Sequence, residues 1–370
     1  MRRPHICFVA PTIWPVLARE GAIDVVGGAE VQQAILARSF AAAGYRVSII
    51  TMDFGQPARV EIDGISVHAA YAPDAGLPVL RFVHPRLTSL WQAMRAVDAD
   101  LYYQRSAGML TGVAAQFCRL HGRQFLYAAA SDRDFLADLP GIRYRRDKWL
   151  FRRGVQQASA LVVQSARQQQ ACRAAYGREA YMVSSCHVPP PPQDCAADGY
   201  VLWVGSVKAL KRPELFMALA RSLPQLRFRM VGGGEGTPEY AAMAAQAAAL
   251  PNVEFVGFVP YHLVQAQFDG ARVFVNTSEW EGFPNTFLQA WARGVPTVSF
   301  FDTGSQHAGQ PVVQVVADQD QLVARVARLM TDEPAWRAAG AQSLACYQAR
   351  HTPAAAVAAY GEIFGKLGLC

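Results

Sequence analysis

The stretch Ser-Glu-Trp-Glu-Gly-Phe-Pro-Asn-Thr-Phe-Leu-Gln-Ala-Trp-Ala-Arg-Gly, residues 278–294, decides how the second half of the chain folds. An apolar run, residues 271–275, precedes it and has the length and composition of a buried strand. Gly294 marks the end of a helix that begins near Pro284 and Asn285. The predicted order is therefore strand, acidic loop and helix.

This order places several polar groups at the carboxyl end of one strand. Glu281 lies in the loop, and Gln289 follows it by eight positions, one turn inside the helix. The backbone N–H groups of Phe283, Asn285 and Thr286 can face an anion. A carboxylate and an amide bind hydroxyl groups, so the stretch suits a phosphorylated, hydroxyl-rich ligand. The alternative is a capped core helix that follows a solvated glutamate.

Length and composition limit the classes of protein to which the chain can belong. A chain of 370 residues with 52% hydrophobic and 17% charged residues favours two domains with a large buried core. No apolar run approaches the roughly 18 residues of a membrane span, and the N-terminus lacks a signal-length apolar region. Seven scattered cysteines favour reduced thiols in the cytoplasm and argue against a zinc site. The net charge of +6 suits anionic partners, but no RNA-type motif concentrates the basic residues, so we expect no nucleic acid.

Strand and helix patterns alternate in both halves and predict two Rossmann-like domains with parallel sheets. Four consecutive prolines, residues 189–192, read as an extended linker and separate a domain of residues 1–190 from one of residues 191–352. Residues 11–26 read as a long loop, and residues 312–316 as the last strand.

Two segments of the first half can face a ligand. Gly27 and Gly28, followed by Glu30, open a helix, and a glycine pair there lets backbone approach a ligand closely; a simple tight turn is the alternative. Ser131 and Asp132 follow a predicted strand at its carboxyl end, where open α/β sheets hold ligands. Both are also ordinary helix-capping residues.

Two segments of the second half suggest phosphate binding. Lys211 and Arg212 follow a strand and precede a helix, which suits a diphosphate leaving group; a solvated helix start is the alternative. The glycine-rich turn at residues 232–236 lacks the dinucleotide fingerprint, because Thr237 occupies the third glycine position. We interpret this turn as close backbone packing beside a ligand.

A basic run, residues 143–153, carries six cations interleaved with Tyr144, Trp149, Leu150 and Phe151. Such a segment is usually a solvated helix face, but it can also lie on anionic lipid. The run therefore predicts a peripheral contact with the inner face of the membrane.

Residues 275–298 resemble the Glu-x7-Glu signature of retaining glycosyltransferases of family four. Glu281 matches the first glutamate, and Gln289 stands in place of the second. The resemblance implies the α/β fold named GT-B, with two facing Rossmann-like domains, parallel sheets and an interdomain cleft. It also implies that the last helix, within residues 353–370, completes the N-terminal, acceptor-side domain, and that the C-terminal domain binds the nucleotide sugar.

Other positions extend the resemblance. Gly205, Ser206 and Lys211 match the Gly-Arg, four residues, Lys motif that binds the donor pyrophosphate, with Ser206 at the arginine position; Lys208 or Arg212 can supply the second charge. The family's histidine near Ser131 is absent here. In full, the resemblance implies catalytic roles for Glu281, Asp132 and Ser131. It implies an acceptor or cleft loop of Gly27, Gly28 and Glu30. The residues implied to bind the donor are Gly205, Ser206, Lys211, Arg212, Gly232, Gly233, Gly257, Phe258, Glu281, Gly282, Phe283, Pro284, Asn285, Thr286 and Gln289.

The resulting hypothesis is transfer of a sugar from a nucleotide sugar to a glycan, a lipid-linked glycan or a small molecule, with retention of configuration. The family works without a bound metal, so we expect no cofactor. Two alternatives remain. The departures at Ser206 and Gln289 suit a catalytically idle partner subunit, and carboxylates in a similar cleft also serve sugar-nucleotide epimerases.

Overall fold

The computed structural model describes residues 3–19, 27–76, 82–191, 198–279 and 281–369. They form two compact units, each described here by itself. Unit 1 holds the described residues of 1–20, 26–186 and 353–370, and unit 2 holds those of 187–352. The chain passes from unit 1 to unit 2 between Cys186 and His187, just before the four prolines.

Unit 1 contains an eight-stranded sheet in the order β3-β4-β2-β1-β5-β6-β7-β8. The strands are β1 (His5–Val9), β2 (Arg46–Thr51), β3 (Arg59–Ile62), β4 (Ile65–Ala69), β5 (Leu101–Arg105), β6 (Gln124–Ala128), β7 (Ala160–Val163) and β8 (Tyr181–Met182). All neighbours are parallel except β3 and β4, which form an antiparallel hairpin. Asp63 and Gly64 both have positive φ in its two-residue turn, as a type I′ turn requires.

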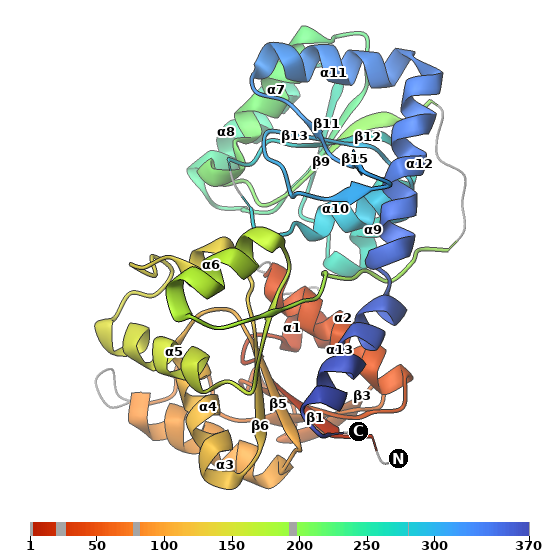
Figure 1. The fold of residues 1–370 in the computed structure, drawn as a ribbon. Helices are drawn as coiled ribbons and strands as arrows, with labels where there is room; N and C mark the ends of the chain where they lie inside the picture. Colours follow the sequence, from red (N-terminus) through yellow and green to blue (C-terminus); the bar gives the residue numbers. More distant parts are fainter. Residues whose placement is uncertain (1–2, 20–26, 77–81, 192–197, 280, 370) are drawn as a thin grey trace. The chain divides into compact units, whose positions relative to one another are not determined.

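The helices of unit 1 cover both faces of this sheet. They are α1 (Trp14–Ala18), α2 (Gly28–Ala42), α3 (Thr88–Val97), α4 (Met109–His121), α5 (Arg145–Gln157), α6 (Ala166–Tyr176) and α13 (Pro353–Lys366). Figure 1 shows α13, drawn in dark blue, beside α2, drawn in red. Phe40 of α2 contacts the rings of Tyr360 and Phe364 of α13, so the end of the chain packs into the unit formed by its beginning.

The prediction of a continuous loop from residue 11 to residue 26 is wrong at residues 14–18, which form α1. This helix has five residues and buries Trp14, Val16 and Leu17. Its length is too short for a 3.6-residue period to show, and Pro15 reads as a loop residue although the first turn of a helix accepts it.

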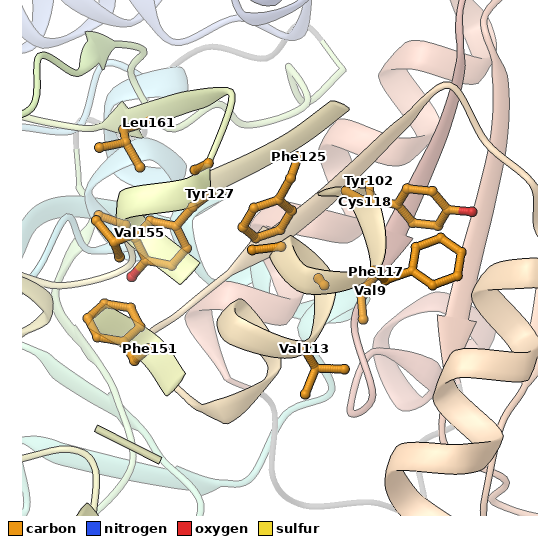
Figure 2. Packing of buried hydrophobic residues seen from close by; sticks show 14 of the residues in the cluster. Val9, Tyr102, Val113, Phe117, Cys118, Phe125, Tyr127, Phe151, Val155 and Leu161 are labelled. Atoms are coloured by element: carbon orange, nitrogen blue, oxygen red, sulfur yellow. The ribbon is translucent and has the colours of Figure 1, made fainter. Parts of the chain in front are cut away.

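One core of unit 1 lies between the sheet and helices α3, α4 and α5, with Phe117, Phe125, Tyr127 and Phe151 among its largest side chains (Figure 2). Two glycines let α4 and α5 approach closely. A Cβ atom at Gly112 would lie 2.3 Å from the backbone oxygen of Leu150, and one at Gly154 would lie 2.5 Å from that of Thr111. Because backbone cannot yield as a flexible side chain can, these positions need glycine.

Unit 2 contains a parallel six-stranded sheet in the order β11-β10-β9-β12-β13-β16. The strands are β9 (Tyr200–Val204), β10 (Phe228–Val231), β11 (Val253–Gly257), β12 (Ala271–Asn276), β13 (Thr297–Ser299) and β16 (Gln314–Val315). The helices are α7 (Pro213–Ser222), α8 (Pro238–Ala248), α9 (Tyr261–Asp269), α10 (Asn285–Ala292), α11 (Gln319–Thr331) and α12 (Glu333–Arg350).

The strand predicted at residues 312–316 is shorter than expected, because only Gln314 and Val315 pair with β13. Before it, β14 (Gln306–His307) and β15 (Gln310–Pro311) form a small antiparallel sheet that the sequence did not predict. Strands of two residues carry no alternation of apolar and polar side chains, so periodicity cannot reveal them.

Both sheets contain a point where the direction of strand addition reverses. In unit 1 this point lies between β1 and β5, and in unit 2 it lies between β9 and β12. Open parallel sheets bind ligands outside the carboxyl ends of the strands at such a point. The loops that follow these four strands are therefore the places to examine for a functional site.

We predict that Gly154→Ala lowers the free energy of unfolding by about 1–3 kcal/mol, because the added methyl group overlaps the backbone of α4. Gly365→Ala is the matched control, since a Cβ atom there meets nothing within 4 Å inside α13. The control should be neutral or stabilising by up to about 1 kcal/mol. Urea unfolding of both variants checks this, and equal effects would contradict the close α4–α5 contact.

Candidate functional site

Hydrogen bonds join the two loops at the reversal point of unit 2. The hydroxyl of Thr277, after β12, accepts from the indole N–H of Trp203 at 2.9 Å and donates to the carbonyl of Lys211 at 2.6 Å. Thr277 and Trp203 are buried. The backbone N–H of Glu279 also donates to the carbonyl of Leu210 at 3.1 Å. The loop after β9 is thus held against the loop after β12.

This junction brings together two residues that lie 70 positions apart in the chain. The Nζ atom of Lys211 forms an ion pair with Oε1 of Glu281, and the hydroxyl of Ser278 donates to the same oxygen at 2.8 Å. The side chains of Lys211 and Glu281 are 25% and 16% exposed, so the pair remains accessible to a ligand. Sequence reasoning singled out both charges but missed their pairing and missed Ser278.

Arg212 braces the same junction. Its Nε atom donates to the carbonyl of Thr277 at 2.8 Å, and its Nη2 atom donates to that of Ser278 at 3.2 Å. The guanidinium also lies 4.7 Å from the ring centre of Phe300. These contacts commit part of the guanidinium to the loop that carries Glu281. Lys208, the other cation considered from sequence, is exposed at the start of the short helix η3 (Ala209–Lys211).

The predicted glycines lie where three turns meet at the carboxyl edge of the sheet. A Cβ atom at Gly232 would lie 2.5 Å from the carbonyl oxygen of Gly205, and one at Gly233 would lie 2.9 Å from the ring of Phe258. Gly257 has φ +80°, a conformation that glycine adopts without strain. These glycines allow close backbone packing, as the sequence predicts. Ser206 follows Gly205 in the same turn and is partly exposed.

Helix α10 follows Glu281 through Gly282, Phe283 and Pro284. Pro284 occupies the N-cap position and makes no side-chain cap hydrogen bond. The first turn, which includes Asn285 and Thr286, therefore retains the partial positive charge of a helix N-terminus. Gln289 lies one turn further in and is 2% exposed.

In unit 1, the predicted loop residue Glu30 turns back onto the start of its own helix. Its Oε1 atom accepts from the hydroxyl of Thr12 at 2.6 Å. A Cβ atom at Gly27 would lie 2.0 Å from its Oε2 atom, so glycine at Gly27 makes room for this carboxylate. Gly28 is the first residue of α2. Glu30 is thus engaged in a local contact at the N-terminus of α2, where a negative charge is favourable.

Ser131 and Asp132 also make local contacts. The hydroxyl of Ser131 accepts from the N–H of Arg133 at 3.2 Å and caps the short helix η2 (Asp132–Phe135). Asp132 accepts from Nε2 of Gln168 at 3.0 Å and pairs with Arg167 at 3.3 Å. The capping alternative considered from sequence therefore describes the position of Ser131.

A second carboxylate of the loop that follows β6 lies close by. Asp134 is buried, and its Oδ2 atom accepts from the hydroxyl of Tyr127 and from the N–H of Ala130, both at 2.8 Å. Burial raises the pKa of this carboxyl group above its usual range. The second aspartate of the Asp-Arg-Asp run was the available signal, but its burial could not be read from the sequence.

The basic run separates into an inner and an outer face. Phe151 is fully buried in the core, so it does not form the lipid-facing surface expected from sequence. Leu150 is half-buried, and its backbone packs on Gly112. The aromatic residues that do lie outside are Tyr144 and Trp149, which are 57% and 56% exposed. Arg143 lies over the ring of Tyr144, and Arg153 lies over that of Trp149.

Within the described residues no helix is long and apolar enough to cross a membrane. The same part of the chain holds no group of three or more His, Cys, Asp or Glu side chains placed to bind a metal ion. The cysteines at positions 7, 118, 172, 186 and 346 are free and buried.

We predict that Thr277→Val lowers the free energy of unfolding by about 1–3 kcal/mol, because it leaves the buried indole N–H of Trp203 without its partner. Thr277→Ser keeps the hydroxyl and should cost only about 0.8 kcal/mol for the lost methyl group. Denaturant unfolding of the two variants checks this. A valine variant as stable as the serine variant would show that the hydroxyl does not hold the junction.

Comparisons with known proteins agree with this architecture. Residues 26–194 match the family model "Glycosyltransferase Family 4", and residues 198–332 match the model "Glycosyl transferases group 1". A lipopolysaccharide 1,6-galactosyltransferase of Salmonella typhimurium is 32% identical over 117 residues, which are 30% of this chain and 32% of that protein. The chain thus spans about a third of the length of this relative.

Two solved structures have the same fold over nearly the whole chain. Sucrose-phosphate synthase from Thermosynechococcus elongatus gives a TM-score of 0.78 at 19% identity and covers 99% of both chains. The apo form of the lipopolysaccharide outer core galactosyltransferase WaaB gives 0.64 at 15% identity and covers 98% of this chain and 99% of that one. The predicted GT-B fold class is confirmed, and with both halves matched by glycosyltransferase models, this chain belongs to the glycosyltransferases of GT-B fold.

Proposed function

We propose that the protein transfers a sugar from a nucleotide-sugar donor to an acceptor, with retention of configuration and without a metal ion. The observation that carries the proposal is the accessible Lys211–Glu281 pair at the reversal point of the unit 2 sheet. It lies just before the N-terminus of α10, where Pro284 makes no side-chain cap hydrogen bond. One place therefore combines a cation, a carboxylate and a helix N-terminus, which suits a diphosphate joined to a sugar.

The leaving group of this reaction is a nucleoside diphosphate, whose negative charge grows as the sugar bond breaks. The ammonium of Lys211 has three N–H donors, and within the described residues it uses one for Glu281, so the others can bind phosphate oxygens. The first turn of α10 adds further N–H groups and its dipole. Arg212 lies in the same loop and contributes positive charge while it braces Glu281. These groups supply the electrostatic stabilisation that a metal ion provides elsewhere.

Glu281 acts on the sugar in this proposal. Its Oε1 atom is held by Lys211 and Ser278, which orients the carboxylate. The carboxylate then accepts a hydrogen bond from a sugar hydroxyl or stabilises an oxocarbenium-like transition state. Gln289 binds the ribose hydroxyls, since an amide both donates and accepts.

The acceptor side belongs to unit 1 in this proposal. The Salmonella relative and WaaB are named for transfer to lipopolysaccharide, and other relatives are named for O-antigen biosynthesis. These names favour a glycan or lipid-linked glycan acceptor. We further propose that the enzyme works in the cytoplasm at the membrane surface. Gly27, Gly28 and the segment from Ser131 to Asp134 are the proposed acceptor-side segments.

The second candidate is a catalytically idle partner subunit, which Ser206 and Gln289 favour because they replace the charged residues of the family pattern. Hydrolysis of a nucleotide sugar by the purified protein separates the two. Thermal-shift screening with uridine, guanosine and adenosine diphosphates first identifies the base of the donor.

We predict that Glu281→Gln lowers the turnover number at least about a hundredfold, because it removes the charge that stabilises the transition state and keeps the shape of the side chain. Gln289→Glu should change mainly the Michaelis constant for the donor, since it alters a ribose contact. Steady-state kinetics on both variants is the measurement. If the Glu281→Gln variant binds donor and turns over like the wild type, Glu281 has no catalytic role, and the idle partner subunit becomes the favoured function.

We predict that activity survives an excess of EDTA, because Lys211 and the α10 N-terminus carry the diphosphate charge in the proposed mechanism. Initial rates with and without the chelator test this. A loss of more than about tenfold that magnesium or manganese restores would show that the leaving group depends on a metal ion.

We also propose that the outer face of α5 binds anionic lipid and so brings a lipid-linked acceptor to the enzyme. Exposed cations at Arg143, Arg145 and Arg153 surround the exposed rings of Tyr144 and Trp149. Arg146 lies 3.4 Å from the ring centre of Phe82, which joins this face to the segment that bears the exposed Val83. Aromatic rings inserted among cations suit the boundary of an anionic bilayer, where each cation contributes about 1 kcal/mol.

We predict that the protein floats with anionic liposomes at low salt and that Trp149→Ala reduces the bound fraction. Leu263→Ala is the matched control, because Leu263 is a large exposed apolar residue of unit 2 outside this face. Flotation in a density gradient measures the bound fraction. Equal recovery in the lipid-free fraction with and without liposomes would rule out this contact.

A further inference from the structure

Arg105 occupies the reversal point of the unit 1 sheet. It is the last residue of β5, the strand that follows β1 in the sheet order at the point where strand addition reverses. The corresponding strand of unit 2 is β12, whose loop carries Glu281. The carboxyl ends of strands at such points are where open parallel sheets hold their ligands.

The charge of Arg105 has little to balance it. Its Nη2 atom lies 3.5 Å from the hydroxyl of Ser185, a long contact with a neutral group. Its Nε atom is buried, and among the described residues it has no hydrogen-bond partner. In the same part of the chain, no carboxylate forms an ion pair with Arg105 within 4.0 Å. The Arg105 side chain as a whole is half-buried. An arginine stays protonated, and a cation that is partly withdrawn from water gains stability from an accompanying anion.

The carboxyl group of Asp134 influences Arg105 electrostatically, but within the described residues the two side chains form no ion pair. The other polar neighbours are hydroxyls: those of Tyr103 and Tyr360 lie 3.4 Å apart, and Tyr103 contacts Arg105. In that pair one hydroxyl donates to the other, and the hydroxyl that accepts keeps a proton for a further acceptor.

The surroundings of Arg105 are held in place before any ligand binds. The side-chain amide of Gln32, on α2, donates to the carbonyl of Cys186 at 2.8 Å and accepts from its N–H at 3.0 Å. Ser185 donates to Gln164, after β7, at 2.6 Å. The segment beside Arg105 is thus tied to α2 and to the end of β7, so the guanidinium faces a preorganised polar surface.

We propose that Arg105 binds an oxyanion, a phosphate or a carboxylate, that the acceptor of the transfer reaction carries. The planar guanidinium forms two parallel hydrogen bonds with either group. These charge-assisted hydrogen bonds are stronger than those to neutral acceptors. The identification of the ligand as the acceptor rests on the proposed function. The oxyanion site itself rests on the buried Nε atom and on the lack of an ion pair within the described residues. The protein is therefore expected to prefer a charged acceptor over a neutral sugar.

The first experiment measures binding of inorganic phosphate by thermal shift in the full-length protein, in a Lys211→Gln background that removes the proposed diphosphate site of unit 2. We expect phosphate to raise the melting temperature, and Arg105→Gln to abolish this rise. Arg119→Gln is the matched control, because it removes the same charge from an exposed position of unit 1. An equal rise in the Arg105→Gln protein would overturn the proposal.

The stability of the unliganded variants separates a ligand site from a structural arginine. Replacing a half-buried cation that has no ion pair within the described residues should leave the melting temperature unchanged or raise it. Arg105→Lys, which keeps the charge, should retain a smaller phosphate response. If Arg105→Gln melts at least about 10 °C lower without phosphate, the guanidinium is a structural group and the proposal fails.

The nature of the anion is resolved with soluble probes. A hexose 6-phosphate, glucuronate and neutral hexose are compared at equal concentration, and vesicles of anionic phospholipid form a separate arm. We expect at least one of the charged sugars, but not neutral hexose, to stabilise the protein through Arg105. A response to vesicles alone would place the anion on a lipid headgroup and overturn the acceptor assignment. These measurements need no donor, so a failure of donor hydrolysis would count against the proposed function and leave the oxyanion site standing.

Discussion

The hydroxyl of Thr277 is the contact on which the site in unit 2 depends. It is buried, and it satisfies the indole N–H of Trp203 and the carbonyl of Lys211 at once. Because both partners lie in or just after the first strand of unit 2, the hydroxyl fixes that strand's loop against the loop after β12. The pairing of Lys211 with Glu281 follows from this, and so does the course of the chain into α10.

The two units share a topology but differ in how they balance charge at the reversal point. In unit 2, Lys211 is paired with Glu281, so an incoming diphosphate shares a cation that the protein already stabilises. In unit 1, Arg105 faces hydroxyls, and its Nε atom has no partner among the described residues. A paired cation is already stabilised without a ligand, whereas an unpaired cation is stabilised most when an anion binds. The carboxyl edges of the two sheets thus provide two chemically different places for binding.

Helix α5 shows how one segment serves both core and surface. Gly154 lets it approach α4 until backbone touches backbone, and Phe151 fills the core beside it. The outer face is thereby left to cations and to the rings of Tyr144 and Trp149. The mixed composition of the run could not be interpreted correctly until the two faces were separated, because adjacent residues of a helix point in different directions.

The sequence by itself determined the alternation of strands and helices, the start of α10 at Asn285 and the glycine turns beside Phe258. These features depend on local chemistry: apolar periodicity, helix-stop residues and backbone conformations that favour glycine. It did not reveal α1, β8 or the small β14–β15 sheet, which are too short to carry a period. Only the tertiary structure decided which charges meet. Lys211 and Glu281 are paired, Glu30 turns back to Gly27, and Arg105 has no ion pair in the described parts of the chain. Side chains distant in sequence are brought together by strand order and by buried hydrogen bonds such as that of Thr277.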